Sequence, residues 1–189
     1  MSSEFSKIKI VAELAQGYEG DQTLLNLLVS AAVKTGADII KLQLIYADDL
    51  ATPDYQWYDL FESLEMDLDI WIDIKEKIQA SNLELFFDVY GQKSFEVAKT
   101  VGADGVKIAT TEFYNEKLIE LALKEFKTVI LSVGGIPVED IDYLVKSTLE
   151  KHSDKLYLIY GFQAEPTPID QNNLNKLQLL KERYKGFKV

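Results

Sequence analysis

Residues 35–44 read TGADIIKLQL and residues 101–110 read VGADGVKIAT, so one short motif occurs twice in the 189-residue chain. Both copies contain Gly-Ala-Asp, then two residues, then a lysine. In each copy a helical pattern ends at the glycine, the usual helix-terminating residue, and an apolar run begins. The motif therefore predicts the same helix-to-strand junction at two places, with a lysine near the far end of each strand.

Six apolar runs of strand length alternate with helical patterns along the chain. The runs are rich in Ile, Val, Leu and Phe, as expected of strands that are buried on both faces. Strands are expected at residues 7–15, 38–45, 83–89, 105–110, 128–133 and 156–162. Helices are expected over 24–32 and 141–149, and from weaker patterns near 71–81, 93–101, 116–126 and 172–185.

This alternation predicts a parallel α/β fold, either a doubly wound open sheet or a (β/α)8 barrel. The final residues GFKV (186–189) have the pattern of a seventh strand that is just beginning, which favours the barrel. A barrel usually needs about 250 residues, so this chain would form an incomplete one of about six βα units. No linker divides the chain, and one domain is expected over 1–189. The acidic and aromatic stretch 46–81 predicts either a satellite core around an extra helix, or a lid or partner surface.

The amino-acid composition excludes several classes of partner and of functional site. The 31 acidic and 20 basic residues give a net charge of −11, which argues against nucleic acid or an anionic membrane as partner. The absence of cysteine excludes a disulfide scaffold, a thiolate zinc site and a cysteine nucleophile. The single histidine, His152, excludes a poly-histidine metal site within this chain. With no membrane-length apolar run and no signal-peptide pattern at the N-terminus, we expect a cytoplasmic protein that acts on small molecules.

Polar side chains occur at the ends of the expected strands, where parallel α/β proteins place their sites. Lys41 and Lys107 occupy matching positions in the two motif copies, so both can converge on one anion. The alternative for each lysine is a salt bridge to a neighbouring carboxylate such as Glu13. Similarly, the Gly134-Gly135 pair predicts either a plain βα turn or a phosphate-binding turn. The residues collected at the strand ends are Glu13, Lys41, Gln43, Asp88, Tyr90, Lys107, Thr110, Ser132, Gln163 and Glu165.

Five stretches that contain these residues resemble the sialic acid synthase family, which includes N-acetylneuraminate, pseudaminate, legionaminate and spore-coat polysaccharide enzymes. They occur in the family's order over nearly the whole chain. The resemblance implies a (β/α)8 barrel, often followed by a small antifreeze-like domain that this chain lacks. The stretches are AELAQGYEGD (12–21), AAVKTGADIIKLQ (31–43), FFDVYGQKSFEVAKTVGADGVKIATTE (86–112), VILSVGG (129–135) and EPTPIDQNNL (165–174).

The resemblance implies an enzyme that condenses phosphoenolpyruvate with an N-acetylated amino sugar, forming a nine-carbon 2-keto acid and releasing phosphate. Carried over by motif, Lys41, Lys107, Thr110 and Ser132 would bind the phosphate and carboxylate of phosphoenolpyruvate. Glu13 and Gln43 would lie near the sugar. The catalytic residues implied are thus Glu13, Lys41 and Lys107, and the substrate-binding residues are Gln43, Asp88, Thr110, Ser132, Gln163 and Glu165.

The sequence also departs from the family pattern. Gly17 and Tyr18 replace an Asn-His pair, Glu165 replaces a tyrosine, and Gln163 stands where some members have asparagine. The family uses a divalent metal, manganese or magnesium, to polarise the sugar aldehyde. Its histidine ligands belong to the seventh and eighth strands, which would follow Val189. The chain by itself is therefore expected to supply no metal ligand and to be inactive.

Unpaired strands at both edges of an open sheet favour pairing with another chain, which predicts a homo-oligomer. Two alternatives to the synthase remain open. One is a non-catalytic sugar- or partner-binding module on the same fold. The other is a different phosphoenolpyruvate–aldose synthase or a keto-acid aldolase, in which Lys107 would form a Schiff base.

Overall fold

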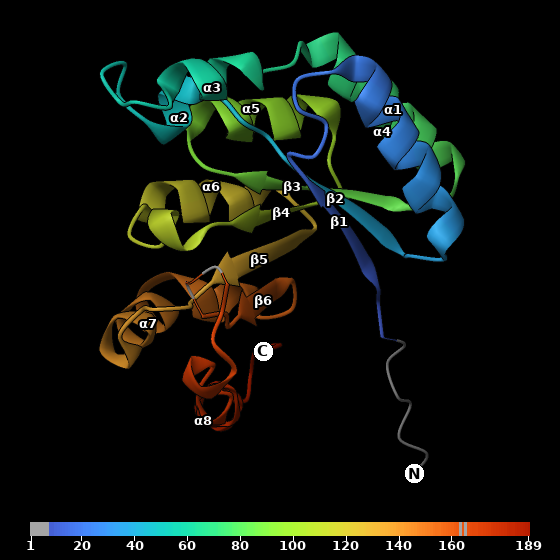
Figure 1. Ribbon diagram of the computed structural model, residues 1–189. Coiled ribbons are helices and arrows are strands. Elements are labelled where there is room, and N and C mark those ends of the chain that lie inside the picture. Colours follow the sequence, from blue (N-terminus) through green and yellow to red (C-terminus); the bar gives the residue numbers. More distant parts are fainter. Residues whose placement is uncertain (1–7, 163, 165) are drawn as a thin grey trace.

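The computed structural model describes residues 8–162, 164 and 166–189. Six strands form one parallel sheet in the order β1-β2-β3-β4-β5-β6 (Figure 1). Each strand lies inside one of the expected runs, so the parallel α/β expectation is confirmed; Lys7, in the first run, falls outside the described residues. The strands are β1 (Val11–Ala15), β2 (Ile39–Gln43), β3 (Glu84–Val89), β4 (Gly105–Ile108), β5 (Thr128–Ser132) and β6 (Leu156–Ile159).

The strand order decides between the two expected architectures. In a doubly wound sheet the order reverses part-way, whereas here each new strand joins the edge that the previous strand formed. The doubly wound alternative is therefore wrong, and the sheet is singly wound and unclosed. The expected seventh strand begins as the sequence indicates: Lys188 forms a parallel bridge with Tyr157, and its carbonyl accepts a 2.8 Å hydrogen bond from the Leu158 N–H.

The repeated motif forms the same junction twice. Gly36 and Gly102 end helical segments with φ of 81° and 72°, a left-handed conformation that glycine adopts without steric cost. The aspartate two residues after each glycine accepts a backbone hydrogen bond from a segment earlier in the chain. Asp38 accepts the Ile10 N–H at 2.9 Å, and Asp104 accepts the Leu85 N–H at the same distance.

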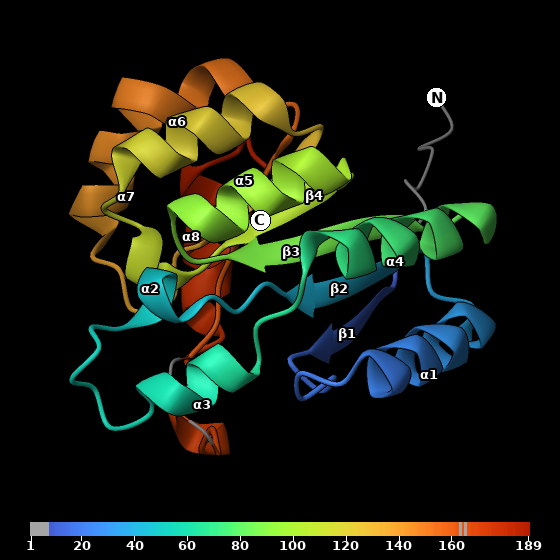
Figure 2. The ribbon, with the colours of Figure 1, turned by 90° about the horizontal axis from the view of Figure 1, so that it is seen from above.

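Helices cover the outer face of the sheet and follow its course (Figures 1 and 2). The outer-facing side chains, such as Leu42, Phe87 and Ile108, are fully buried in the main core beneath these helices. The main helices are α1 (Gln22–Ala32), α4 (Leu68–Ala80), α5 (Gln92–Val101), α6 (Glu116–Glu125), α7 (Val138–Leu144) and α8 (Asn175–Arg183). They match the expected helical patterns, and α7 continues as a π-helical turn, Val145–Leu149.

The stretch 46–81 differs from its expected form. Its long helix, α4, is the regular crossover between β2 and β3 rather than an extra helix, and Trp71 on α4 packs in the main core against Phe87 with ring centroids 5.4 Å apart. The additional elements are two short helices, α2 (Ala47–Leu50) and α3 (Tyr58–Ser63). Asp49 of α2 accepts hydrogen bonds from the Ser94 N–H and hydroxyl at 2.7 and 2.6 Å, so α2 is fastened to the first turn of α5.

Side-chain alternation gives the inner face of the sheet a different composition. Near the amino ends of the strands this face is apolar. The Phe86 ring there fills the space that a side chain at position 105 would need, and the residue at that position is Gly105. Near the carboxyl ends it carries charged and hydroxyl groups. Solvent reaches this face at both edges, where Val11, Tyr157 and Ile159 are exposed.

Candidate functional site

Four charged side chains form one row across the carboxyl end of the inner face. The register pairs Glu13 of β1 with Lys41 of β2, and Asp88 of β3 with Lys107 of β4. Gln43 of β2 pairs with Asp88 and completes the register between the two halves of the row. Because strand residues two apart share a face, all five side chains project to the same side.

The row is held together by ion pairs centred on one buried carboxylate. Asp88 is 1% exposed; its Oδ1 lies 2.7 Å from the Lys41 ammonium and its Oδ2 lies 2.9 Å from the Lys107 ammonium. Lys41 also contacts Glu13. Both lysines therefore form the expected alternative, a salt bridge to a neighbouring carboxylate, and they share Asp88. Their convergence on a bound anion stays a prediction.

Two hydroxyl groups lie at the carboxyl ends of β4 and β5. The Thr110 and Ser132 oxygens are 2.6 Å apart, and Ser132 is buried at the end of β5. Thr110 begins a short 3-10 turn directly after β4. These groups extend the polar row from β4 to β5 with neutral hydroxyls.

Tyr90 also belongs to this site, although it was not among the residues to which the resemblance gave a catalytic or substrate-binding role. It follows Asp88 by two residues and so lies above it on the inner face. Burial raises the pKa of the Tyr90 phenol, and the charges of Asp88 and Glu13 raise it further. Tyr90 is therefore a neutral hydroxyl beside the charged row. Its spacing from Asp88 was a sequence signal, but nothing in the sequence indicated its proximity to Glu13 on another strand.

Tyr18, one of the departures from the family pattern, is not at the surface of this site. It is fully buried, its ring packs edge-on against Trp71 at 5.4 Å, and its hydroxyl donates to the Gln43 carbonyl at 3.0 Å. Tyr18 therefore fastens the loop after β1 to the end of β2. Next to it, β1 breaks its register between Glu13 and Ala15, and Ala15 has a φ of 50°.

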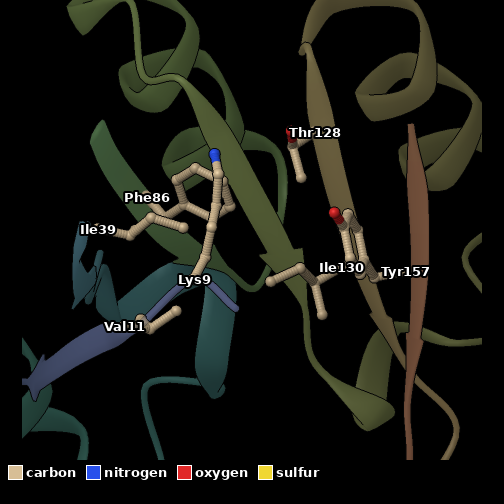
Figure 3. A pocket seen from close by; sticks show the side chains of 7 residues that line it. All are labelled: Lys9, Val11, Ile39, Phe86, Thr128, Ile130 and Tyr157. Carbon is tan, nitrogen blue, oxygen red and sulfur yellow. The ribbon is translucent and has the colours of Figure 1, made fainter. Parts of the chain in front are cut away.

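Below the charged row the inner face contains an apolar cavity of about 220 Å³ (Figure 3). Its polar groups are few: Lys9 is paired with Glu84 at 2.7 Å, and Thr128 and Tyr157 contribute hydroxyls. The cavity lies on the same face as the charged row but nearer the amino ends of the strands, so it forms the floor beneath the site. It is lined by Lys9, Val11, Ile39, Phe86, Thr128, Ile130 and Tyr157.

The remaining expected residues are placed as follows. Gln163 and Glu165 lie outside the described residues. Gly135 has a φ of 77° in the turn that leads from β5 to α7, a helix of seven residues. His152 ends a short 3-10 turn and lines a surface hollow beside Lys151 and Lys155.

The described residues do not fit a divalent metal. Within residues 8–162, 164 and 166–189, no three His, Cys, Asp or Glu side chains are grouped closely enough to hold an ion. The two carboxylates of the site, Glu13 and Asp88, already form ion pairs with lysine ammonium groups. A metal would have to compete with these lysines.

Comparison with known protein families shows the family of this chain. A sequence model of the NeuB family matches residues 28–189. The chain belongs to the NeuB family. Family members are synthases of sialic-acid-like sugars, so the resemblance seen in the sequence is confirmed.

Two curated relatives illustrate the match. Pseudaminic acid synthase of Campylobacter jejuni subsp. jejuni serotype O:23/36 is 27% identical over 192 residues, covering 94% of this chain and 56% of that protein. N,N'-diacetyllegionaminic acid synthase of Legionella pneumophila is 22% identical over 193 residues, covering 93% of this chain and 54% of that protein. This NeuB-family chain thus spans about half the length of the curated relatives it matches.

Solved structures support the fold. The N-acetylneuraminic acid (sialic acid) synthetase of Leptospira borgpetersenii superposes with a TM-score of 0.86 at 24% identity, covering 99% of this chain and 67% of that chain. None of the described helices has the length and apolarity needed to cross a membrane.

Proposed function

We propose that this NeuB-family chain contributes the phosphoenolpyruvate-binding part of a sialic-acid-type synthase. The reaction would join C3 of phosphoenolpyruvate to the aldehyde carbon of an N-acetylated amino sugar. Water would add at C2, and the C2–O bond to phosphate would break to release phosphate. The product would be a nine-carbon 2-keto acid.

The observation that carries this proposal is that Lys41 and Lys107 lie on one face, both against Asp88, and that the Thr110 and Ser132 hydroxyls follow at the ends of β4 and β5. Phosphoenolpyruvate presents a phosphate and a carboxylate, and both groups accept hydrogen bonds from ammonium and hydroxyl donors. Lysine has three N–H donors, so Lys107 retains donors for a ligand after its contact with Asp88. Glu13 and Gln43, on the β1–β2 side of the row, would then face the sugar.

We further propose that the six-stranded sheet is the larger part of a barrel whose remaining strands add at β6, where Lys188 already pairs with Tyr157. A metal that polarises the sugar aldehyde, as expected for the family, would take its ligands from outside the described residues. The 189-residue chain should therefore bind phosphoenolpyruvate but not turn it over.

The test is a titration of the 189-residue chain with phosphoenolpyruvate, followed by ³¹P NMR and calorimetry. Binding should be lost in Lys107→Met and retained in Lys75→Met, a matched control in which the lysine pairs with Asp104 at 2.5 Å away from the site. The same chain with phosphoenolpyruvate, an N-acetylhexosamine and manganese should release no phosphate. Equal binding in both variants, or steady phosphate release, would contradict the proposal.

The second candidate is a non-catalytic sugar- or partner-binding module. It is favoured by one observation: carboxylates already accept from both lysines, so the row is satisfied without a ligand. This candidate predicts that an N-acetylated sugar binds without phosphoenolpyruvate, and that Lys41→Met leaves sugar affinity unchanged.

A further inference from the structure

The charges of the row cancel. Lys41 and Lys107 contribute two positive charges, and Glu13 and Asp88 contribute two negative charges. The two carboxylates are not equivalent, because the Glu13 side chain is 47% exposed whereas that of Asp88 is 1% exposed. Solvent and salt screen Glu13, but they screen Asp88 much less. The buried counter-charge of the site is therefore Asp88.

Asp88 contacts both lysines at once, one with each carboxylate oxygen. This bridge holds the two ammonium groups close together. It also places a negative charge within about 3 Å of both groups that would receive an anionic ligand. Coulomb repulsion grows with each charge on the ligand and is strong where the dielectric constant is low. Asp88 therefore opposes a multiply charged anion more than it opposes a singly charged one.

We propose that Asp88 is a specificity-determining residue that limits how much negative charge the site accepts. It positions Lys41 and Lys107, and it lowers the affinity of the row for multiply charged, phosphate-bearing anions. The identity of the natural ligand as phosphoenolpyruvate rests on the proposed function. The effect of Asp88 on anion affinity does not, because any anion bound by the two lysines would experience it.

The test uses inorganic phosphate and pyruvate as probes, titrated by calorimetry at low salt into the unmodified chain and into Asp88→Asn. The amide keeps the shape of the side chain and removes its charge. Phosphate should bind about tenfold more tightly or better, the lower end of what close charge pairs contribute across interfaces. Pyruvate, with one charge, should gain less. Asp104→Asn is the matched control, since it removes the same charge from a lysine pair elsewhere and should leave phosphate affinity unchanged.

Two further variants guard against loss of folding. Asp88→Thr removes the charge and keeps an oxygen that can accept from one lysine. Glu13→Gln alters a half-exposed carboxylate, and it should tighten phosphate binding less than either Asp88 variant. If both Asp88 variants unfold, the unmodified chain is titrated with phosphate above and below the second pKa of phosphate. A dianion that binds much more tightly than the monoanion would then overturn the proposal.

The remaining outcomes are also decisive. Weaker phosphate binding in Asp88→Asn, no binding in any variant, or an equal gain in Asp104→Asn would overturn the role of Asp88. Phosphoenolpyruvate that binds no better than phosphate in every variant would contradict the proposed function. It would leave the inference about Asp88 intact.

Discussion

The two copies of the Gly-Ala-Asp motif place a lysine at the same position of a strand but in different surroundings. Lys41 lies on β2 between two strands that both carry carboxylates, and its side chain is 7% exposed. Lys107 lies on β4, where one neighbour supplies Asp88 and the other supplies Ile130, and its side chain is 22% exposed. The same local sequence therefore gives one lysine that is enclosed by counter-charges and one that is open to a ligand.

The largest difference between the copies should appear in stability. Lys41→Met removes one of the two partners of the buried Asp88 and also leaves Glu13 without its lysine. Breaking a buried ion pair by removing one partner costs about 3–5 kcal/mol. Lys107→Met leaves the Lys41–Asp88 pair in place and should cost less than half as much. Urea unfolding of the two variants measures the difference, and equal losses would contradict the contrast between the two lysines.

A second difference between the copies lies two residues before each lysine, where the first copy has Ile39 and the second has Gly105. A Cβ at Gly105 would lie 2.6 Å from the Phe86 ring and 2.8 Å from the Thr128 carbonyl oxygen. Gly105→Ala should therefore lower the free energy of unfolding by about 1–3 kcal/mol, the usual cost of overpacking. A fully stable Gly105→Ala chain in thermal unfolding would show that the Phe86 ring does not fix this position.

The copies should behave alike at their first glycines. Gly36 and Gly102 both have positive φ and open space around the missing Cβ. Alanine at either position should cost about 1–2 kcal/mol through backbone strain alone. Gly186→Ala is the control, because that glycine also has open space but no positive φ, and it should be neutral. Unequal losses at the two motif glycines would break the equivalence of the junctions.

The smallest effect is expected at the Arg183–Asp142 ion pair, which lies at the surface and so contrasts with the buried row of charges. The hydrogen bond from Arg183, with a further one from Tyr184, lowers the pKa of Asp142 from 3.8 to about 2. A lowered pKa in the folded state gives stability that is present above pH 4 and is lost as the pH falls toward 2. Asp142→Asn should remove this part of the acid sensitivity. Acid titrations of unfolding that remain identical in the two chains would contradict the assignment.

Much of the fold was predictable because the signals were local. The six apolar runs and the two motif glycines lie in stretches whose conformation depends on their own residues, and the structure confirms them. The strand order was not predictable from periodicity, since both architectures use the same alternating elements. The role of α4 was missed because the aromatic residues of 46–81 suggested a separate core, whereas Trp71 joins the main one.

The candidate site was predictable as a set of residues but not as an arrangement. Strand-end positions identified Lys41 and Lys107, and the convergence follows from the register. The burial of Asp88 between them and the position of Tyr90 beside two carboxylates depend on how three strands align. Sequence spacing within one strand carries no information about that alignment.

The most direct test of this account is NMR observation of the lysine ammonium groups during a titration with phosphoenolpyruvate. The Lys107 signal should shift most, the Lys41 signal should shift less because two carboxylates hold that lysine, and the Lys75 signal should not respond. Equal shifts at Lys75 and Lys107, or an unchanged Lys107 signal at saturating ligand, would contradict the claim that this row of side chains is the anion-binding site.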